Sequence, residues 1–104
     1  MQAARNSAQV VVVAGRLDIA TVADVRPRLH AAISACSGDL VIDLAGVETI
    51  DVTGLGALVG AQRRAARAGR RLRLRAVPPP VMGALASTRL YRALPVERAR
   101  VAVA

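Results

Sequence analysis

The sequence predicts a small α/β domain in which a mostly parallel or mixed β-sheet carries helices mainly on one face. Segments rich in β-branched residues alternate with segments of helical periodicity, in the order strand, helix, strand, helix, strand, helix. No repeat or disordered linker interrupts this order, and 104 residues suffice for one domain with a buried core, so we expect a single domain over 1–104. The segment 71–76 alternates apolar residues with arginine, which indicates that one sheet face is not fully covered.

Two buried strands are expected in the first half of the chain. Gln9–Ala14 (QVVVVA) is a β-branched run that ends at a glycine, and the following Gly15–Asp18 is expected to form a turn. Leu40–Leu44 (LVIDL) has the composition of a second buried strand. Ala45–Ile50 is expected to be a short connection after it.

The helix between these strands shows apolar residues every three or four positions. Thr21 and Asp24 have the spacing of a capping box. Pro27 fits if the helix proper begins near Asp24, because proline is tolerated in a first turn. The helix is expected to end near Ala35, and Cys36 continues its apolar face as a small core residue.

The second half of the chain repeats the pattern. A helix is expected from Gly54 to a stop at Gly69, followed by a half-exposed strand over Arg71–Ala76. Pro80 can occupy the first position of a third helix. Beyond it the signal weakens, and Ala99–Val103 is expected to form a final strand.

The composition argues against several classes of function. Tyr91 is the only aromatic residue, so base stacking on aromatic rings cannot support binding of single-stranded nucleic acid. His30 and Cys36 are the only residues of their types, so a catalytic triad or a cysteine zinc site has no basis. No signal-peptide or membrane-span pattern is present, and we expect a cytoplasmic protein without membrane insertion.

The net charge of +8 comes from fifteen arginines and no lysine. A solvated basic surface is the plain interpretation, because no nucleic-acid-binding motif accompanies the charge. Charge alone supports weak, nonspecific binding of anions or nucleic acid. The arginines that would carry such binding are Arg63, Arg64, Arg67, Arg70, Arg71, Arg73 and Arg75.

The stretch Val41–Gly56 (VIDLAGVETIDVTGLG) places Asp51 and Thr53 between a strand and a helix. Both residue types are favoured in turns and caps, so spacing alone allows Thr53 to be an N-cap and Asp51 a turn residue. The stretch resembles the signature of the STAS family, which includes bacterial anti-sigma-factor antagonists and domains of anion transporters. Gly15–Asp18 resembles the upstream Gly-x-Leu-Asp motif of that family, and the similarity covers roughly 9–94.

This resemblance implies a STAS-like fold and the function of an anti-sigma-factor antagonist without enzymatic activity or cofactor. The implied partner is an anti-sigma factor with serine/threonine kinase activity, which would phosphorylate Thr53 and thereby switch binding off. Asp18, Asp51, Gly54 and Leu55 would contact that partner. A phosphate at Thr53 would lie at the positive end of the helix dipole, where anions are tolerated.

Two alternatives remain open at this stage. Gly54, Gly56 and Gly60 approach a dinucleotide-binding fingerprint, although the spacing differs from the common form and no acidic residue stands at the ribose position near Leu74. The second alternative keeps the fold and changes the partner: a STAS subunit of an ABC-type lipid transporter that is not phosphorylated.

Overall fold

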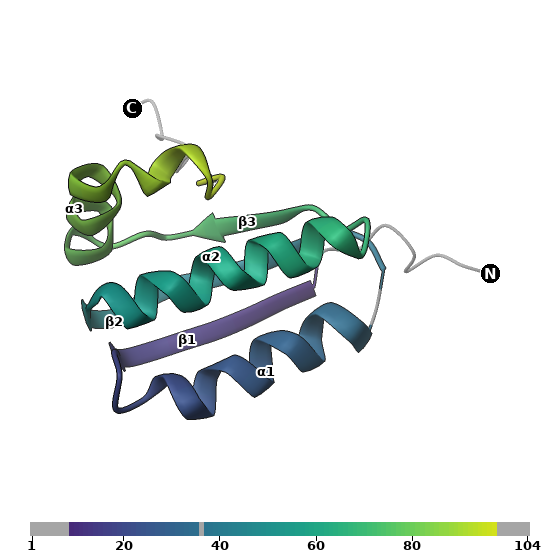
Figure 1. Cartoon of the computed structure of the whole chain (residues 1–104), viewed down its shortest axis with the longest axis horizontal. Helices are drawn as coiled ribbons and strands as arrows, with labels where there is room; N and C mark the ends of the chain where they lie inside the picture. Colours follow the sequence, from purple (N-terminus) through teal and green to yellow (C-terminus); the bar gives the residue numbers. More distant parts are fainter. Residues whose placement is uncertain (1–8, 36, 98–104) are drawn as a thin grey trace, which may run out of the picture.

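The computed structural model describes residues 9–35 and 37–97, in which three strands form one parallel sheet. The elements in chain order are β1 (Gln9–Leu17), α1 (Val22–Ala35), β2 (Leu40–Ile50), α2 (Val52–Arg67), β3 (Leu72–Arg75), α3 (Pro79–Thr88) and the 3-10 helix η2 (Leu90–Arg92). The spatial order of the strands is β1-β2-β3. Helices α1 and α2 lie side by side on one sheet face, and α3 lies beyond the end of β3 (Figure 1). The predicted α/β class is confirmed.

The core between the sheet and the helices consists of aliphatic side chains, as the composition predicts. Leu17, Ile42, Leu44 and Leu74 come from the three strands, and Leu58 comes from α2; all five are fully buried. Burial of one such side chain contributes about 1.5–3 kcal/mol to folding.

The other face of the sheet carries polar side chains and exposed valines. Val12 of β1 is 56% exposed there. Arg75 of β3 pairs with its register partner Asp43 of β2 at 2.8 Å, and Arg73 lies 3.5 Å from Glu97. The predicted alternation along β3 is therefore confirmed, because its leucines are buried and its arginines are half-exposed.

Asp43 is the anchor of this polar face. The backbone N–H of Ala45 donates to its Oδ1 at 2.9 Å, and Arg75 donates to its Oδ2 at 3.0 and 2.8 Å. These hydrogen bonds hold the pKa of Asp43 below its usual value, the backbone N–H contributing most.

Strands β1 and β2 both continue past their predicted ends. Of the predicted turn Gly15–Asp18, all but Asp18 is strand, and so is the predicted connection Ala45–Ile50. The two extensions pair with each other up to Leu17 and Ile50. Two register shifts interrupt this pairing, and Gly15 has a φ of +78° beside one of them. The extensions owe their strand conformation to this pairing rather than to local propensity.

Helix α1 starts earlier than predicted. It begins at Val22, which places Pro27 inside the helix and not in its first turn. Pro27 cannot donate the hydrogen bond of that position, and its ring is exposed. The expected final strand at Ala99–Val103 and the expected core position of Cys36 lie outside the described residues.

Candidate functional site

The sequence-predicted site lies where β1 and β2 end and the chain enters α1 and α2. Because the strands are parallel, their carboxyl ends meet at one edge of the sheet. This edge brings Asp18 of the β1–α1 loop next to Asp51 at the start of α2. The backbone N–H of Asp51 donates to the carbonyl of Leu17 at 3.2 Å, which fixes the two segments to each other.

Asp51 is the N-cap of α2. Its Oδ1 accepts from the N–H of Gly54 at 2.8 Å, and its Oδ2 accepts from the N–H of Ile19 at 3.2 Å. One carboxylate therefore holds the β1–α1 loop against the start of α2, and we call this pair of hydrogen bonds the Asp51 clamp. The alternative in which Thr53 caps the helix and Asp51 is a turn residue is wrong, because α2 begins at Val52.

Thr53 is the second residue of α2 and is half-buried. Among residues 9–35 and 37–97, its hydroxyl takes part in no hydrogen bond, and neither Asp18 nor Asp51 orients it. The first N–H groups of a helix have no intrahelical acceptor and attract anions. The position thus offers an unengaged hydroxyl in surroundings that tolerate a phosphate.

Gly54 is buried against β1. A Cβ atom at this position would overlap the carbonyl oxygen of Leu17 and would lie 2.9 Å from the carbonyl carbon and the Cγ of the same residue. The glycine is therefore required by the close approach of α2 to β1. It contributes to a partner surface only by letting α2 sit in this place.

Leu55 does not reach the surface. It is 3% exposed and belongs to the hydrophobic core, so its side chain is unavailable to a partner. The expectation that Leu55 contacts a partner is therefore corrected. Leu55 lies on the apolar face of the amphipathic helix α2, and this face packs on the sheet.

Asp18 organises the start of α1. Its Oδ1 accepts from the N–H groups of Ala20 at 2.9 Å and Thr21 at 3.2 Å, and the Asp18 N–H donates to Thr21 Oγ1 at 3.0 Å. This reciprocal arrangement replaces the capping box predicted for Thr21 and Asp24. Asp18 also pairs with Arg16 at 3.2 Å, and its side chain is only 22% exposed.

Two apolar residues beside the Asp51 clamp were missed by the sequence analysis. Ile19 is 74% exposed and Val52 is 80% exposed, although aliphatic side chains of this size are usually buried. Ile19 contributes its N–H to the clamp, and Val52 follows Asp51 directly. The sequence does contain a sign of them: each of the two turns that cap α1 and α2 is polar except for one aliphatic residue. We call Ile19 and Val52 the apolar pair.

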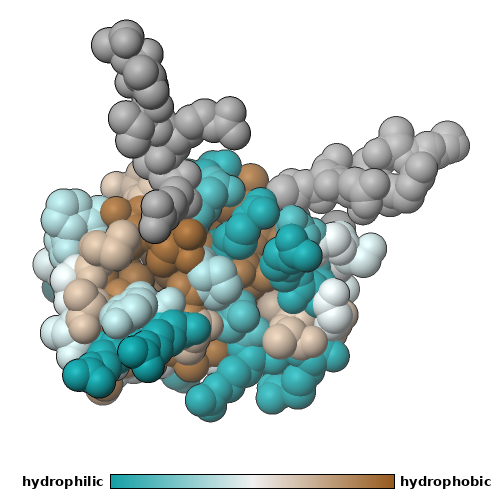
Figure 2. Space-filling view, turned by 90° about the horizontal axis from the view of Figure 1, so that it is seen from above, coloured by the Kyte–Doolittle hydropathy of each residue, from teal (hydrophilic) through white to brown (hydrophobic). Residues whose placement is uncertain are grey.

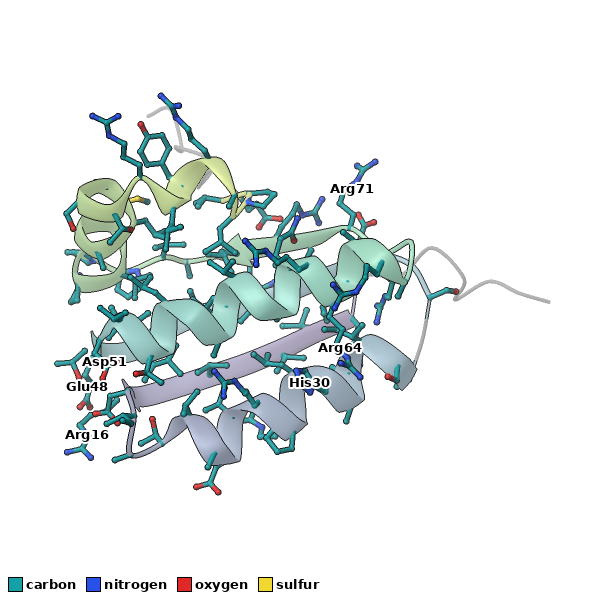
Figure 3. All side chains as sticks on the ribbon, in the orientation of Figure 1. Arg16, His30, Glu48, Asp51, Arg64 and Arg71 are labelled. Atoms are coloured by element: carbon teal, nitrogen blue, oxygen red, sulfur yellow. The ribbon has the colours of Figure 1, made fainter. Side chains whose placement is uncertain are left out.

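Charge is distributed unevenly along the molecule. In Figure 3, Arg16, Glu48 and Asp51 lie at the end where β2 meets α2, whereas His30, Arg64 and Arg71 lie toward the opposite end. The site end therefore carries the carboxylates of Glu48 and Asp51 beside Arg16, although the chain as a whole has a net charge of +8.

The seven arginines between 63 and 75 do not form one basic surface. Arg70 is buried and donates to backbone carbonyls, including that of Ala32 at 2.7 Å. Arg73 and Arg75 lie on the open sheet face in ion pairs. Of the seven, only Arg63, Arg64, Arg67 and Arg71 are exposed, which weakens the case for nucleic acid as a partner.

The glycines of α2 do not form a nucleotide-binding loop. Gly54 is the third residue of the helix rather than part of the strand–helix turn. Gly56 and Gly60 are exposed, and nothing lies within 4 Å of a Cβ atom placed on either. A dinucleotide fingerprint needs its first glycines in the turn, where the backbone approaches the pyrophosphate, so this structure does not support that alternative.

Comparison with known proteins agrees with this geometry. No helix in the described ranges has the length and apolar character needed to cross a bilayer. Among curated protein sequences, none matches the chain significantly. Among solved structures, the chain is similar to the unphosphorylated anti-sigma factor antagonist SpoIIAA, with a TM-score of 0.71, 19% identity, and coverage of 94% of this chain and 85% of the other.

Two further structures have the same fold. A putative anti-sigma factor antagonist from Thermotoga maritima gives a TM-score of 0.70 and 19% identity, covering 86% of this chain and 80% of the other. A sulfate transporter family protein from Wolinella succinogenes gives 0.69 and 23%, covering 84% and 70%. The family profile described as "Mlab, STAS domain" matches residues 1–96, and the chain therefore belongs to the STAS domain family.

Proposed function

We propose that this chain is a STAS binding module that is switched by phosphorylation of Thr53 and has no catalytic activity of its own. Its partner would be an anti-sigma factor with serine/threonine kinase activity. The observation that carries the proposal is the state of Thr53: a half-buried hydroxyl without a hydrogen bond among the described residues, at the second position of α2 and next to the exposed Val52. A kinase needs such an unengaged hydroxyl as phosphate acceptor.

The unphosphorylated site presents the apolar pair for binding. Ile19 and Val52 supply two aliphatic side chains that gain free energy when a partner covers them. The Asp51 clamp keeps the two turns in a fixed relation, so little conformational entropy is lost on binding.

Phosphorylation would change the charge of this surface without unfolding it. A phosphate adds nearly two negative charges beside Asp51, and the helix N-terminus stabilises them locally. The same dianion opposes the covering of Ile19 and Val52, because a partner that buries it must leave it unpaired or supply a cation. Loss of binding therefore requires no change of fold.

The proposed absence of catalysis rests on the same hydrogen bonds. A nucleophilic Thr53 would need a base within hydrogen-bond reach. The oxygens of Asp51 accept from backbone N–H groups, and Asp18 caps α1 and pairs with Arg16. His30 lies on α1, away from Asp51 (Figure 3).

A second candidate uses the same surface without phosphate, as a STAS subunit of an ABC-type lipid transporter. Val52 favours it, because an aliphatic residue that is 80% exposed next to Thr53 gives the surface a permanent apolar contact. In this case Thr53 would lie inside a constant interface.

The two candidates are separated by incubating the purified chain with kinase-type anti-sigma factors of the same cell and ATP. We expect phosphate on Thr53, located by mass spectrometry, and none on the Thr53→Ala variant. In the absence of ATP, Thr53→Glu should bind the anti-sigma factor at least about tenfold more weakly than Thr53→Ala. Thr49→Glu, which adds the same charge at an exposed position near the end of β2, is the matched control and should bind within about threefold of wild type.

Stability measurements keep folding apart from binding. Because Asp51 and not Thr53 caps α2, Thr53→Ala should change the free energy of unfolding by less than about 0.5 kcal/mol. Absence of phosphate on the wild type, with equal partner binding by Thr53→Ala and Thr53→Glu, would refute the switch and favour the second candidate.

A further inference from the structure

A groove lies between α3, η2 and the segment that follows η2. It has a volume of about 490 Å³ and is lined by Met82 and Ala86 of α3, Tyr91 of η2, and Val96. We call it the α3 groove. Figure 2 views the molecule from the side of α3 and η2 and shows hydrophobic residues among hydrophilic ones on this face.

The walls of the groove are anchored in the core. Leu85 of α3 and Leu94, which follows η2, are fully buried. The segment that carries Val96 is bound to β3, because Leu74 donates to the carbonyl of Pro95 at 2.8 Å and accepts from the N–H of Glu97 at 2.6 Å. The groove is therefore preformed rather than dependent on a ligand for its shape.

The side chains in the groove are of the kinds that dominate protein interfaces. Tyr91 is the only aromatic residue of the chain, and it is 48% exposed instead of contributing to the core. Met82 beside it is 42% exposed. Tyrosine, methionine and arginine are enriched at protein interfaces, where each offers a large contact area.

Two arginines flank Tyr91 in the sequence, Arg89 at the end of α3 and Arg92 in η2. Arg89 and Arg92 are exposed, and none of the ion pairs found in residues 9–35 and 37–97 includes either. The sequence has no acidic residue from Val52 to Val96, and Glu97 is paired with Arg73 at 3.5 Å. The groove thus has a mostly apolar lining, and the segment that carries Tyr91 adds positive charge that no ion pair among the described residues neutralises.

The backbone at Arg89 has an unfavourable conformation for a residue with a side chain. Arg89 ends α3 with φ +59° and ψ +18°, in the left-handed conformation. Glycine is the usual residue there, because a side chain costs about 1 kcal/mol or more in that conformation. Among the described residues Arg89 gains no ion pair in return, so its guanidinium group is free to contact a partner.

We propose that the α3 groove is a second docking surface, separate from the Thr53 site, for a segment of a partner protein that carries apolar side chains flanked by carboxylates. The carboxylates of the segment would bind the positively charged Arg89 and Arg92. Its apolar side chains would pack on Met82 and Tyr91. The proposal commits to a protein segment, because the exposed Tyr91 and Met82 are of the residue types enriched at protein interfaces.

The probe for this surface is a displayed library of random peptides of about 15 residues, long enough for a helix to present apolar anchors at positions i, i+3, i+4 and i+7. The full chain is the target, and peptides that also bind Tyr91→Ala are removed. We expect the remaining peptides to contain apolar residues beside Asp or Glu. The best peptide should shift the amide signals of Met82, Ala86, Tyr91 and Val96 in an NMR titration and leave those of Thr53 and Ile19 unchanged.

Variants test the two parts of the groove separately. Met82→Ala, which plays no part in the selection, should weaken the peptide at least about threefold. Arg89→Gly should weaken it about three- to fivefold while leaving the melting temperature equal or higher, because glycine suits the left-handed position. Arg63→Gln, an equal charge change on α2 away from the groove, is the matched control and should leave binding unchanged.

Three results would overturn the proposal. One is the absence of any peptide that distinguishes wild type from Tyr91→Ala. Another is a set of selected peptides whose binding survives replacement of their acidic residues by glutamine. The third is Tyr91-dependent binding to phosphatidylglycerol vesicles, which would assign the groove to lipid. None of these affects the Thr53 switch, since the groove variants should still accept phosphate on Thr53.

Discussion

Gly54 of α2 packs against the carbonyl group of Leu17 in β1 so closely that no Cβ atom fits between them. This contact brings the start of α2 down onto the end of β1. It also places the Asp51 clamp and Thr53 at the same edge of the sheet. The position of the candidate site therefore depends on one glycine.

Gly54→Ala should destabilise the domain by about 1–3 kcal/mol or more, because the new methyl group meets backbone atoms that cannot rotate away. Gly56→Ala is the matched control: it lies on the same helix with open space around it, and it should stabilise the domain by about 0.5–1 kcal/mol. Urea denaturation of both variants checks the pair. Similar changes in the free energy of unfolding would contradict the role given to Gly54.

Asp51→Ala should cost about 0.5–2 kcal/mol of stability, because α2 loses its N-cap. It should also release the β1–α1 loop, so that the amide of Ile19 exchanges hydrogen faster than in the wild type. Glu48→Ala removes an exposed carboxylate at the same end and should change stability by less than about 0.5 kcal/mol. Unchanged exchange at Ile19 in Asp51→Ala would show that the clamp does not hold the loop.

The ion pair between Asp43 and Arg75 should make stability depend on acid pH. The folded pKa of Asp43 lies below the ordinary value of 3.8, so its contribution is fully present above that pH and is lost as the pH falls through the lower folded value. Arg75→Gln should therefore be less stable than wild type at pH 7. Chemical denaturation between pH 7 and pH 2 should show the difference shrinking in the most acidic samples, and a constant difference would contradict this account.

Arg70 holds the end of α1 from inside the fold. Its guanidinium donates to the carbonyls of Ala32 at 2.7 Å, Ile33 at 3.1 Å and Gly38 at 2.8 Å. Arg70→Met should cost about 1–3 kcal/mol, because buried acceptors lose their donors. Arg71→Gln, at the exposed neighbouring position, should be nearly neutral in the same thermal melts; an equal loss in both variants would mean that charge rather than the buried hydrogen bonds matters.

The sequence carried enough information to predict the main elements and the place of the site. The runs at β1 and β2 have strand composition, and the Asp-x-Thr-Gly pattern marks the start of α2. What it could not decide was which of two good capping residues caps that helix. Asp and Thr are both favoured N-cap residues, and Asp51 gains a second hydrogen bond from the N–H of Ile19, which is far away in sequence.

The other errors have the same origin in contacts between distant segments. The extensions of β1 and β2 contain glycine and polar residues, and they are strands because they pair with each other. Arg70 stands in a run of arginines, and nothing local distinguishes it from Arg71, although one is buried and the other exposed. Leu55 follows Thr53 closely and yet faces the core, because the direction of α2 is set by the sheet.

In the Asp51 clamp, Asp51 accepts a hydrogen bond from the backbone N–H of Ile19, and the side chain of Ile19 takes no part. Any amino acid with an N–H group can therefore stand at position 19 without disturbing the loop, and Val52 is equally unconstrained by its neighbours. In a cell that contains several related modules, these two positions can diverge at little thermodynamic cost while the scaffold stays constant. Related modules can thus be kept specific for different partners by the side chains at these two positions, which the fold itself does not require.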